Sequence, residues 1–378
     1  MSIASFQFHT APNIVFGEGE ASRLALHAGG RLGQSILIIT DPGVRSLGLL
    51  NEAAESFGSA ASVTVFDGVG PDPSRAMVEA ALATAREIDA TGIVGFGGGS
   101  PLDVAKTVAL LAGSDEAMED VWGVGQAKGP RLPLVLVPTT AGTGSEVTPV
   151  AIITVGETEK RGVSTPLLQP DVAILDPVLT FGLPASVTAA TGIDAMVHAI
   201  EAYSSKNANN NPISRALARE ALQLLSRNIE AATAGEQQAR APMLLGSMLA
   251  GQAFANSPVA AVHALAYPLG GRFKVPHGLS NAVLLPHVLA FNIQEPSACQ
   301  AYQELSPLIG AHGSEGFIDR LVNLSQSVGL SIDMRELGVE EGHLDQMADD
   351  AMLQTRLLVN NPRPLARDDA RAIYAAAL

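Results

Sequence analysis

The sequence IVGFGGGSPLDVAK (residues 93–106) joins an apolar, strand-like run to a helix start through three consecutive glycines. Glycines at such a turn let the backbone approach a ligand closely, and the free amides at a helix start attract phosphate groups. Ser100 and Asp103 are candidate caps of that helix. The stretch does not match the dinucleotide pattern G-x-G-x-x-G, because Ser100 occupies the last position, and it is not a P-loop. Alone, it indicates either a phosphate site or a tight turn.

A second small, polar loop, PTTAGTGSEVT (138–148), follows the next apolar run, LPLVLVP (132–138). The carboxyl ends of neighbouring parallel strands lie at one edge of a sheet, which is where ligands bind in open α/β sheets. Two such loops together therefore favour a nucleotide-phosphate site over a simple turn.

The first half of the chain alternates short β-branched runs with segments rich in helix formers. The strand-like runs are SILIIT (35–40), SVTVF (62–66), TGIVGF (91–96) and LPLVLVP (132–138), and the helical segments are RSLGLLNEAAESFG (45–58) and RAMVEAALATAREIDA (75–90). Such alternation predicts crossover units and a buried parallel sheet. Two further strands are expected at PVAIITV (149–155) and DVAIL (171–175), arranged as a hairpin.

The second half, from about Ser186, is rich in Ala and Leu and contains no convincing strand. At 378 residues the chain is too long for one compact core. We therefore predict an α/β domain over residues 1–182 and an all-helical domain over residues 183–378, with the boundary in the Pro- and Gly-bearing segment at 176–185.

The composition is that of a globular protein, with 47% hydrophobic and 16% charged residues. The single cysteine, Cys299, fits a reducing compartment. No apolar run approaches the length of a membrane span, and MSIASFQFHTAPN (1–13) lacks the features of a signal peptide, so we expect a cytoplasmic protein that does not bind membranes. The net charge of −15 and the lack of Lys/Arg clusters argue against nucleic acid and favour small-molecule ligands.

Asp41 follows the strand-like run SILIIT directly. An acidic residue at a strand end can accept hydrogen bonds from a ribose hydroxyl and would repel a 2′-phosphate. However, DPG (41–43) is also a good turn sequence. From these residues alone, the turn is the favoured interpretation.

Asp194 and His198 stand four residues apart in the helical stretch TGIDAMVHAIEAY, which places both side chains on one face. With His263 and His277 they form a possible set of one carboxylate and three imidazoles. Such a set would leave a divalent ion with one net positive charge and an open position for an alcohol oxygen. The alternative is that Asp194 pairs only with His198 and that the other histidines are structural. Their apolar surroundings weaken this alternative, because an unliganded polar group is costly there.

With these motifs together, the chain resembles the iron-containing (group III) alcohol dehydrogenase family almost from end to end. The resembling motifs, in the family's order, are PNIVFGEGE (12–20), GFGGGSPLDVAK (95–106), PTTAGTGSEVT (138–148), GIDAMVHAIEAY (192–203), HALAYPLGGRFKVPHG (263–278) and NPRPLARDDARAIYAAAL (361–378). The resemblance implies an amino-terminal Rossmann-like domain, then an all-helical domain, with the active site in the cleft between them. It also implies reversible, NAD-linked oxidation of a small alcohol to an aldehyde or ketone, with a divalent metal as Lewis acid.

Position by position, the resemblance implies four metal ligands: Asp194, His198, His263 and His277. It implies a cofactor site that comprises Asp41, Gly97, Gly98, Gly99, Ser100, Asp103, Thr139, Thr140, Thr143 and Lys160. In this site Asp41 would favour NAD over NADP, which overturns the turn-only interpretation. Within HALAYPLGGRFKVPH, we expect Gly270, Gly271 and Pro276 to turn the chain so that His277 returns to the metal.

Two positions depart from the family pattern. Asp72 of the PDP sequence (71–73) stands where the family often has asparagine, which puts a polar contact there in doubt. Tyr267 stands where many members have a histidine that is proposed to pass the alcohol proton to solvent. A tyrosine can donate and accept a hydrogen bond, but its reference pKa of about 10 makes it a poorer relay near neutral pH. Tyr267 is therefore the candidate proton relay.

Three His and one Asp suit Fe(II), which we expect as the metal, with Zn(II) as the alternative. Relatives are commonly dimeric through their amino-terminal strands, so SFQFHTAP (5–12) is the expected contact of a homodimer.

Several other activities compete with this prediction. Two use the same chemistry: a hydroxyacid–oxoacid transhydrogenase and a maleylacetate reductase, the latter disfavoured by the intact ligand set. A dehydroquinate-synthase-like lyase also combines NAD with a metal, but it needs a basic pocket of which the chain offers little. A non-catalytic binding module is disfavoured because complete metal and cofactor motifs coexist.

Overall fold

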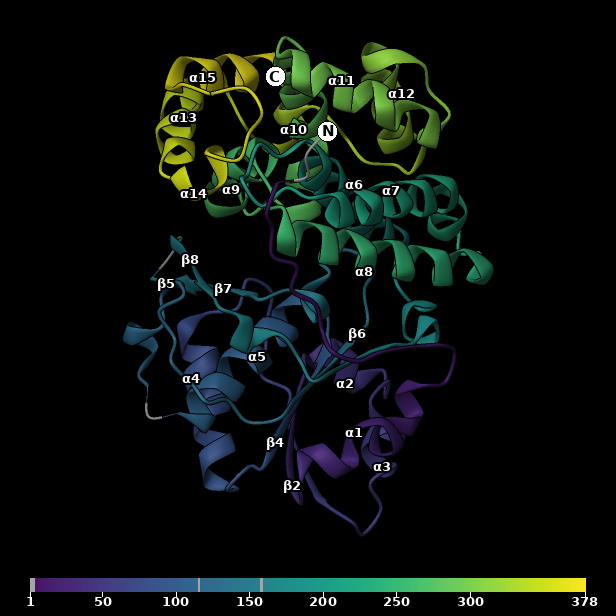
Figure 1. Ribbon diagram of the computed structural model, residues 1–378, viewed down its shortest axis with the longest axis vertical. Helices are drawn as coiled ribbons and strands as arrows, with labels where there is room; N and C mark the ends of the chain where they lie inside the picture. Colours follow the sequence, from purple (N-terminus) through teal and green to yellow (C-terminus); the bar gives the residue numbers. More distant parts are fainter. Residues whose placement is uncertain (1–3, 115, 157–158) are drawn as a thin grey trace. The chain divides into compact units, whose positions relative to one another are not determined.

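The computed structural model describes residues 4–114, 116–156 and 159–378 (Figure 1). These residues form two compact units. The α/β unit comprises residues 9–140 and 144–182, and the helical unit comprises residues 4–8, 141–143 and 183–378. The chain thus enters the helical unit for good at Leu183, and two short earlier segments also belong to that unit.

The α/β unit is built on a parallel sheet, which in the described residues has six strands in the order β1-β9-β6-β4-β2-β3. The strands are β1 (Ile14–Phe16), β2 (Ser35–Ile39), β3 (Ser62–Phe66), β4 (Gly92–Gly97), β6 (Leu134–Pro138) and β9 (Val172–Leu175). The four strands predicted at 35–40, 62–66, 91–96 and 132–138 are therefore confirmed. Their apolar character follows from burial on both faces.

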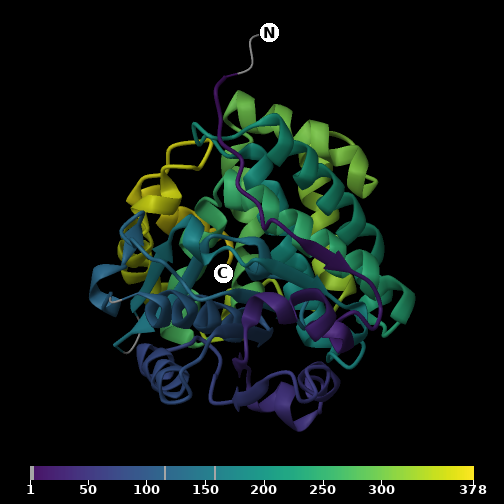
Figure 2. The ribbon, with the colours of Figure 1, turned by 60° about the horizontal axis from the view of Figure 1, so that its bottom comes forward.

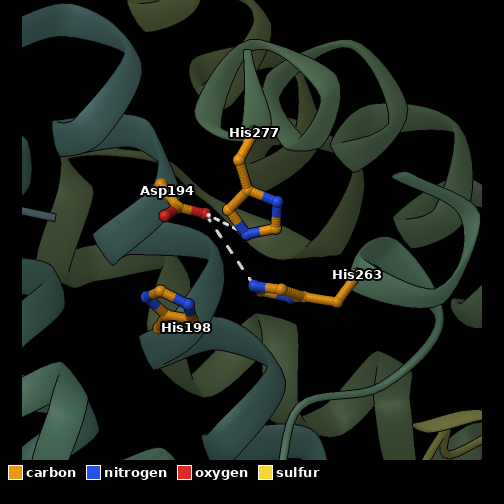
Figure 3. Close-up of side chains that lie close together, drawn as sticks. All are labelled: Asp194, His198, His263 and His277. Carbon is orange, nitrogen blue, oxygen red and sulfur yellow. Dashed lines mark ion pairs between the residues drawn. The ribbon is translucent and has the colours of Figure 1, made fainter. Parts of the chain in front are cut away.

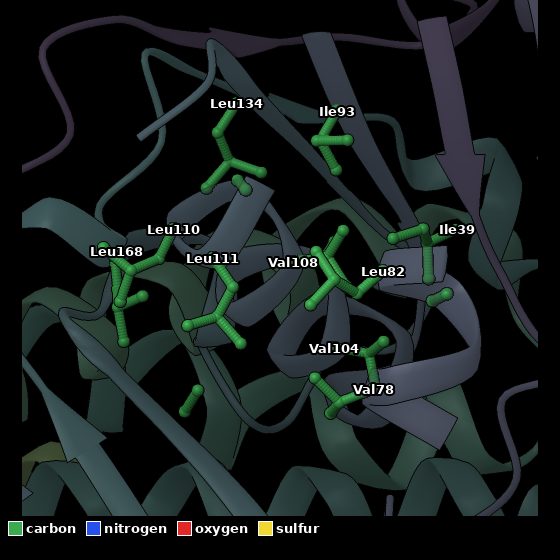
Figure 4. Close-up of a cluster of buried hydrophobic side chains, with 14 of the residues drawn as sticks. Ile39, Val78, Leu82, Ile93, Val104, Val108, Leu110, Leu111, Leu134 and Leu168 are labelled. Atoms are coloured by element: carbon green, nitrogen blue, oxygen red, sulfur yellow. The ribbon is translucent and has the colours of Figure 1, made fainter. Parts of the chain in front are cut away.

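Helices cover both faces of this sheet. Successive residues of a strand point to opposite faces, so alternate strand residues pack against different helices. Ile36 and Ile38 pack on one side with α1 (Leu24–Leu32), α2 (Pro42–Ser46) and α3 (Asn51–Glu55). Leu37 and Ile39 pack on the other side with α4 (Arg75–Glu87) and α5 (Gly99–Gly113). Figure 4 shows this second cluster, with Ile39, Ile93 and Leu134 from the strands and Val78, Leu82, Val104 and Val108 from the helices.

The strand order creates a topological switch point between β2 and β4. After β2 the chain forms β3 on one side of it, and then β4 on its other side. In open α/β sheets, the crevice at such a point, beyond the carboxyl ends of the strands, is where ligands bind. Here Asp41 follows β2 and Gly97 ends β4.

The expected hairpin of 149–155 with 171–175 is wrong. β7 (Val150–Val155) pairs antiparallel with β8 (Glu159–Ser164), and β5 (Gly123–Val124) lies beside β8 in a small second sheet. β9, by contrast, lies in the large sheet between β1 and β6. The sequence of β8, EKRGVS, has no apolar run, because most of this strand lies near the surface. The predicted helical segment 45–58 also differs: it breaks at Gly48, which has a φ of 69°, into α2 and α3.

The described part of the helical unit contains helices and no strand, which confirms the all-helical prediction. Its helices are α6 (Ala185–Ser204), α7 (Pro212–Thr233), α8 (Arg240–Asn256), α9 (Ala261–Phe273), α10 (His277–Asn292), α11 (Pro296–Leu305), α12 (Gly313–Ser327), α13 (Leu344–Met352), α14 (Thr355–Leu358) and α15 (Arg367–Ala376). α6 is central and buried from Gly192 to Tyr203, and it packs against α7, α8 and α10. The buried Tyr374 of α15 donates a hydrogen bond of 2.7 Å to the carbonyl of Leu265 in α9.

Within the described ranges, the structure has no helix that is both long and apolar enough to cross a membrane. The chain from residue 4 to residue 13 forms neither helix nor strand and leads into β1, which is the purple arrow in Figure 2.

Candidate active site

Four side chains of the helical unit converge on one point (Figure 3). One carboxylate oxygen of Asp194 and one ring nitrogen each of His198, His263 and His277 all lie within 4.8 Å of one another. Asp194 Oδ1 is 3.6 Å from His277 Nε2 and 3.8 Å from His263 Nε2. In a tetrahedral site the ligand atoms are roughly 3.4 Å apart when each bond is about 2.1 Å. The two Asp194–histidine distances are already close to this value, and the cluster as a whole needs to contract to hold an ion.

Three helices supply these side chains. α6 carries Asp194 and His198 on successive turns, as the spacing predicts. His263 lies in the first turn of α9, and His277 is the first residue of α10. α9 ends at Lys274, which adopts the left-handed conformation with a φ of 57°.

The expectation that Gly270 and Gly271 turn the chain is wrong. Both lie inside α9, and neither has a positive φ. The turn is made by Lys274, and Pro276 then precedes the first residue of α10. A non-glycine residue in this conformation is uncommon, which is why the glycine pair misled the sequence interpretation.

His263 shows that the cluster fits a cation. Its side chain is buried, and its Nε2 atom, which faces Asp194, has no hydrogen-bond partner within the described part of the chain. The other ring nitrogen, Nδ1, lies 2.6 Å from Oε2 of Glu201. A buried polar atom without a partner is costly, and a divalent ion among these four groups would satisfy it.

The electrostatics of the cluster favour the metal-binding forms of His198 and Asp194, whereas, against the effect of burial, the Glu201 and Asp194 carboxylates raise the pKa of His263. Burial lowers the pKa of His198 to about 3, although Asp194 opposes this shift, so the imidazole is neutral near pH 7. Burial works against ionisation of Asp194, but the neighbouring imidazoles and the Asn281 amide hold its pKa below the usual range. An ionised carboxylate beside neutral imidazoles is the state that binds a divalent ion.

Glu201 and Asn281 each contact a side chain of the cluster, His263 and Asp194 respectively. The sequence analysis did not identify either residue as part of the site. Asn281 Nδ2 donates a hydrogen bond of 2.6 Å to Asp194 Oδ1. Each lies one turn from a predicted ligand, Glu201 after His198 on α6 and Asn281 after His277 on α10. That spacing was the signal that could have identified them.

His198 is held from two sides. Its Nδ1 atom lies 3.2 Å from the carbonyl oxygen of Gly142, and its ring stacks on Phe254 with 4.4 Å between the centroids. Gly142 belongs to one of the short segments that join the helical unit, so this part of the polar loop 138–148 contributes to the cluster.

Tyr267 lies one helical turn after His263 on α9 and is partly buried. Pro268 follows it inside the helix, and because proline has no N–H, the carbonyl of Ala264 loses its usual helical donor. Both residues thus lie where the α9 backbone departs from regular hydrogen bonding.

Most of the predicted cofactor residues gather at the carboxyl edge of the large sheet. Gly97 has a φ of 151°, and a Cβ atom there would lie 2.8 Å from Pro101 Cγ and 3.1 Å from Asp41 Oδ2. Only glycine fits this position. Gly98, which caps α5, lies beside Thr140, and the amide of Thr139 donates to the carbonyl of Gly97.

The prediction that Ser100 or Asp103 caps α5 is wrong, because both lie within the helix and Gly98 is its N-cap. No side chain caps this end in the described residues, so the amides of Gly99 and Ser100 at the helix start can face an anion.

Asp41 combines the two roles considered for it. Its Oδ1 atom accepts a hydrogen bond of 2.9 Å from the amide of Val44 and so caps α2. Its Oδ2 atom lies next to Gly97, at the switch point of the sheet. The turn role therefore does not exclude the cofactor role.

Asp103 is used inside the α/β unit. Ser145 Oγ donates to Asp103 Oδ1 over 2.6 Å, and the amide of Ile152 donates to Asp103 Oδ2 over 2.9 Å. The side chain thus holds the loop after β6 and the strand β7.

Lys160 and Thr143 are the other two predicted cofactor residues. Lys160 forms an ion pair with Asp72, so the position that departs from the family pattern does make a polar contact. Thr143 belongs to the helical unit, whereas the other predicted cofactor residues belong to the α/β unit.

Two protein-family models match the chain. The model described as "Iron-containing alcohol dehydrogenase" matches residues 11–177, and the model described as "Fe-containing alcohol dehydrogenase family, C-terminal" matches residues 188–378. A long-chain-alcohol dehydrogenase of Geobacillus thermodenitrificans is 42% identical over 92% of this chain and 90% of its own length.

Solved structures with lower sequence identity have nearly the same fold. The crystal structure of a 1,3-propanediol oxidoreductase has a TM-score of 0.94 at 35% identity and covers 99% of this chain and 100% of its own. A sulfoacetaldehyde reductase from Bifidobacterium kashiwanohense, solved in complex with NAD+, has a TM-score of 0.90 at 28% identity and covers 99% of this chain and 98% of its own.

Proposed function

The chain belongs to the iron-containing alcohol dehydrogenase family, and from this premise we propose that Asp194, His198, His263 and His277 hold its metal ion. As a member of that family it is an NAD-linked oxidoreductase that acts on small alcohols and aldehydes and uses a divalent metal. The observation that carries the ligand proposal is the buried Nε2 atom of His263, which faces Asp194 and has no hydrogen-bond partner among the described residues.

A bound divalent ion supplies a Lewis acid that lowers the pKa of an alcohol hydroxyl, and NAD supplies the hydride acceptor. The chain's own residues provide the charge balance. Asp194 contributes the negative charge of the ligand set and neutral imidazoles contribute none, so a divalent ion held here would leave the site with one net positive charge. Tyr267, one turn after His263, accepts and passes on the hydroxyl proton through its phenol.

The α/β unit binds NAD at the switch point of its sheet. The start of α5 and the glycines before it receive the pyrophosphate, because amides and the positive end of the helix dipole face that edge. Asp41 accepts hydrogen bonds from the adenosine ribose, and its charge disfavours the 2′-phosphate of NADP. Thr139 and Thr140 after β6, Thr143, and Lys160 paired with Asp72 complete the proposed cofactor site.

Fe(II) is the proposed metal. Three imidazoles and one carboxylate also suit Zn(II), which binds more tightly in a mixed pool, so purified protein can carry zinc in place of iron. The proposed substrate is a small alcohol or the corresponding aldehyde, as the names of a long-chain-alcohol dehydrogenase and a 1,3-propanediol oxidoreductase among the similar proteins suggest.

We further propose a homodimer in the cytoplasm. β1 is an edge strand of the large sheet, and its outward residues Ile14 and Phe16 are 37% and 40% exposed. Exposed apolar side chains on an unpaired edge favour pairing with a second copy. Cys299 is a free thiol, which is consistent with a reducing compartment.

The test is an alcohol panel with NAD, run on metal-free protein and on protein reloaded with Fe(II) or Zn(II). We expect net NADH formation only after reloading, and its loss in His263→Ala and His277→Ala. His312→Ala, which removes an exposed histidine of the same unit, is the matched control. Turnover retained by both ligand variants would sink the metal assignment. Exchange of hydride between two substrates without net NADH would indicate a transhydrogenase.

A further inference from the structure

The carboxylate of Glu201 is buried between α6 and α9, and it accepts three hydrogen bonds from the start of α9. We propose that Glu201 is the positioning residue of the metal centre, because it holds the Nδ1 edge of the His263 ring and so directs Nε2 toward the cluster. This inference rests on the proposed function for the identity of the ligand set.

Glu201 Oε2 lies 2.6 Å from His263 Nδ1, so a hydrogen carried by Nδ1 can be donated to this carboxylate. A neutral ring with its hydrogen on Nδ1 has its lone pair on Nε2, the atom that faces Asp194 at 3.8 Å. Because Glu201 contacts the opposite side of the ring, it cannot bind the same ion and acts only through His263.

Glu201 also binds the backbone at the start of α9. The amide of Val262 donates to Glu201 Oε1 over 2.7 Å, and the amide of Ala260 donates to Oε2 over 3.0 Å. These amides belong to the start of α9, which has no capping side chain of its own in the described residues. Glu201 therefore caps α9 from a neighbouring helix and fixes the main chain that directly precedes the ligand His263.

Helix α6 carries Glu201 together with two of the proposed ligands. Asp194, His198 and Glu201 lie on one face of α6, at spacings of four and three residues. α6 thus holds two ligands directly and a third through Glu201. His198 is oriented by a neutral carbonyl at 3.2 Å, whereas His263 is oriented by a charged group at 2.6 Å. The charged contact is the stronger one.

Glu201→Gln separates these effects. The amide nitrogen replaces one acceptor oxygen at nearly constant volume. If this nitrogen faces His263, it donates to Nδ1 and moves the ring hydrogen to Nε2, which removes the lone pair from the metal side. If the amide is reversed, the nitrogen meets the Val262 amide, donor against donor. Both arrangements weaken the site.

The measurement is metal affinity and does not need turnover. Metal-free wild type, Glu201→Gln and Glu201→Asp are titrated with Zn(II) and Co(II) against a competing chelator, and the gain in Tm on saturation with metal is recorded. We expect Kd to rise about 10- to 100-fold in Glu201→Gln, with a smaller rise in Glu201→Asp, which keeps the charge. Glu304→Gln removes a carboxylate of the same unit that contacts Tyr203 instead, and we expect its metal affinity to match the wild type.

Three outcomes would overturn the inference. The first is an unchanged Kd in Glu201→Gln. The second is a lower Tm, equal with and without metal, at unchanged Kd, since that would mark a purely structural cap. The third is a wild-type protein that binds no metal, which would overturn the ligand set itself. If Glu201→Gln does not fold, the intermediate affinity expected of Glu201→Asp carries the test.

Discussion

The Nζ atom of Lys106 lies 2.7 Å from the Oγ atom of Ser145, and the lysine side chain is completely buried. Nζ also donates to Thr148 Oγ1 over 3.1 Å and to the carbonyl of Val150 over 2.9 Å, and Asp103 lies 3.5 Å away. One ammonium group from α5 thus holds the end of the polar loop 138–148 and the start of β7. Burial, opposed by Asp103 and Glu146, lowers its pKa.

Lys106→Met should therefore loosen the loop from α5. The variant leaves Asp103 and Glu146 without their cation, and removing one partner of a buried charged group typically costs about 3 kcal/mol of unfolding free energy. We expect a loss of this size in denaturant titrations, and weaker binding of NAD by fluorescence with metal affinity unchanged. Lys128→Met, at an exposed lysine of the same unit, should change neither quantity.

Glu146 makes stability depend on pH. Burial raises the pKa of its carboxyl from 4.5 to about 7, against the opposing effects of its own backbone amide and Lys106. Between these two values the folded state binds more protons than the unfolded state, so this group's contribution to stability falls as pH rises from 4.5 to 7 and is then level. Glu146→Gln should remove that slope and stabilise the protein at pH 8 by at most about 3 kcal/mol. The free energy of unfolding at pH 5 and pH 8 measures it, and an equal slope in both proteins would contradict it.

Gly278 sets the distance between α10 and α6. A Cβ atom at this position would lie 2.3 Å from the carbonyl oxygen of Ala190. Gly278→Ala should push the adjacent His277 away from Asp194, raise the Kd for Zn(II) at least about tenfold, and cost about 2 kcal/mol of unfolding free energy. Gly270→Ala is the control: it lies inside α9 and meets only the Val275 carbonyl at 3.6 Å. We expect this control to bind metal normally and to gain up to about 1 kcal/mol of helix stability.

Asp41→Asn tests the cofactor preference without disturbing the turn. Asparagine keeps the cap on the Val44 amide, because it is as good an N-cap as aspartate, but it removes the charge beside Gly97. We expect the ratio of kcat/KM for NADP to that for NAD to rise about tenfold or more, which corresponds to about 1.4 kcal/mol. An unchanged ratio, with the cap and the stability intact, would exclude Asp41 from the 2′-position.

Tyr267→His should speed alcohol oxidation near neutral pH, because an imidazole with a reference pKa of about 6.5 exchanges protons there more readily than a phenol. Tyr267→Phe removes the hydroxyl and should slow the reaction. The kcat–pH profiles of both variants measure this, with metal content as the control for site integrity. Identical profiles in all three proteins would mean that the proton leaves by another path.

Much of the fold follows from local patterns. The strands β2, β3, β4 and β6 are apolar runs bounded by Gly, Pro or Asp, and both their position and their parallel arrangement were predictable. β8 was not, because only Val163 of this polar strand is buried and its pairing with β7 depends on tertiary packing. The same holds for the left-handed Lys274, since nothing in a lysine side chain signals such a turn.

The candidate site was also predictable from the sequence only in part. The spacing of Asp194 and His198, with two further histidines in apolar surroundings, was enough to suggest a four-ligand set, and the structure brings the four together. The role of Glu201 was not predictable, because its partners are main-chain amides of a helix almost 60 residues later in the sequence. The resemblance places Asp103 in the cofactor site, whereas the contacts of its side chain in the structure are with Ser145 and the amide of Ile152 in β7.

Because the proposed ligands lie on α6, α9 and α10, a bound ion would also stabilise the folded chain. An ion held by His198 and His277 would close a loop of roughly 80 residues, and a permanent link over such a length restricts the unfolded chain by about 4.5 kcal/mol. The ion would then act as a reversible cross-link between helices of the helical unit. Metal starvation should shorten the lifetime of the protein against proteases, so that the supply of metal controls how much enzyme persists as well as how fast it turns over.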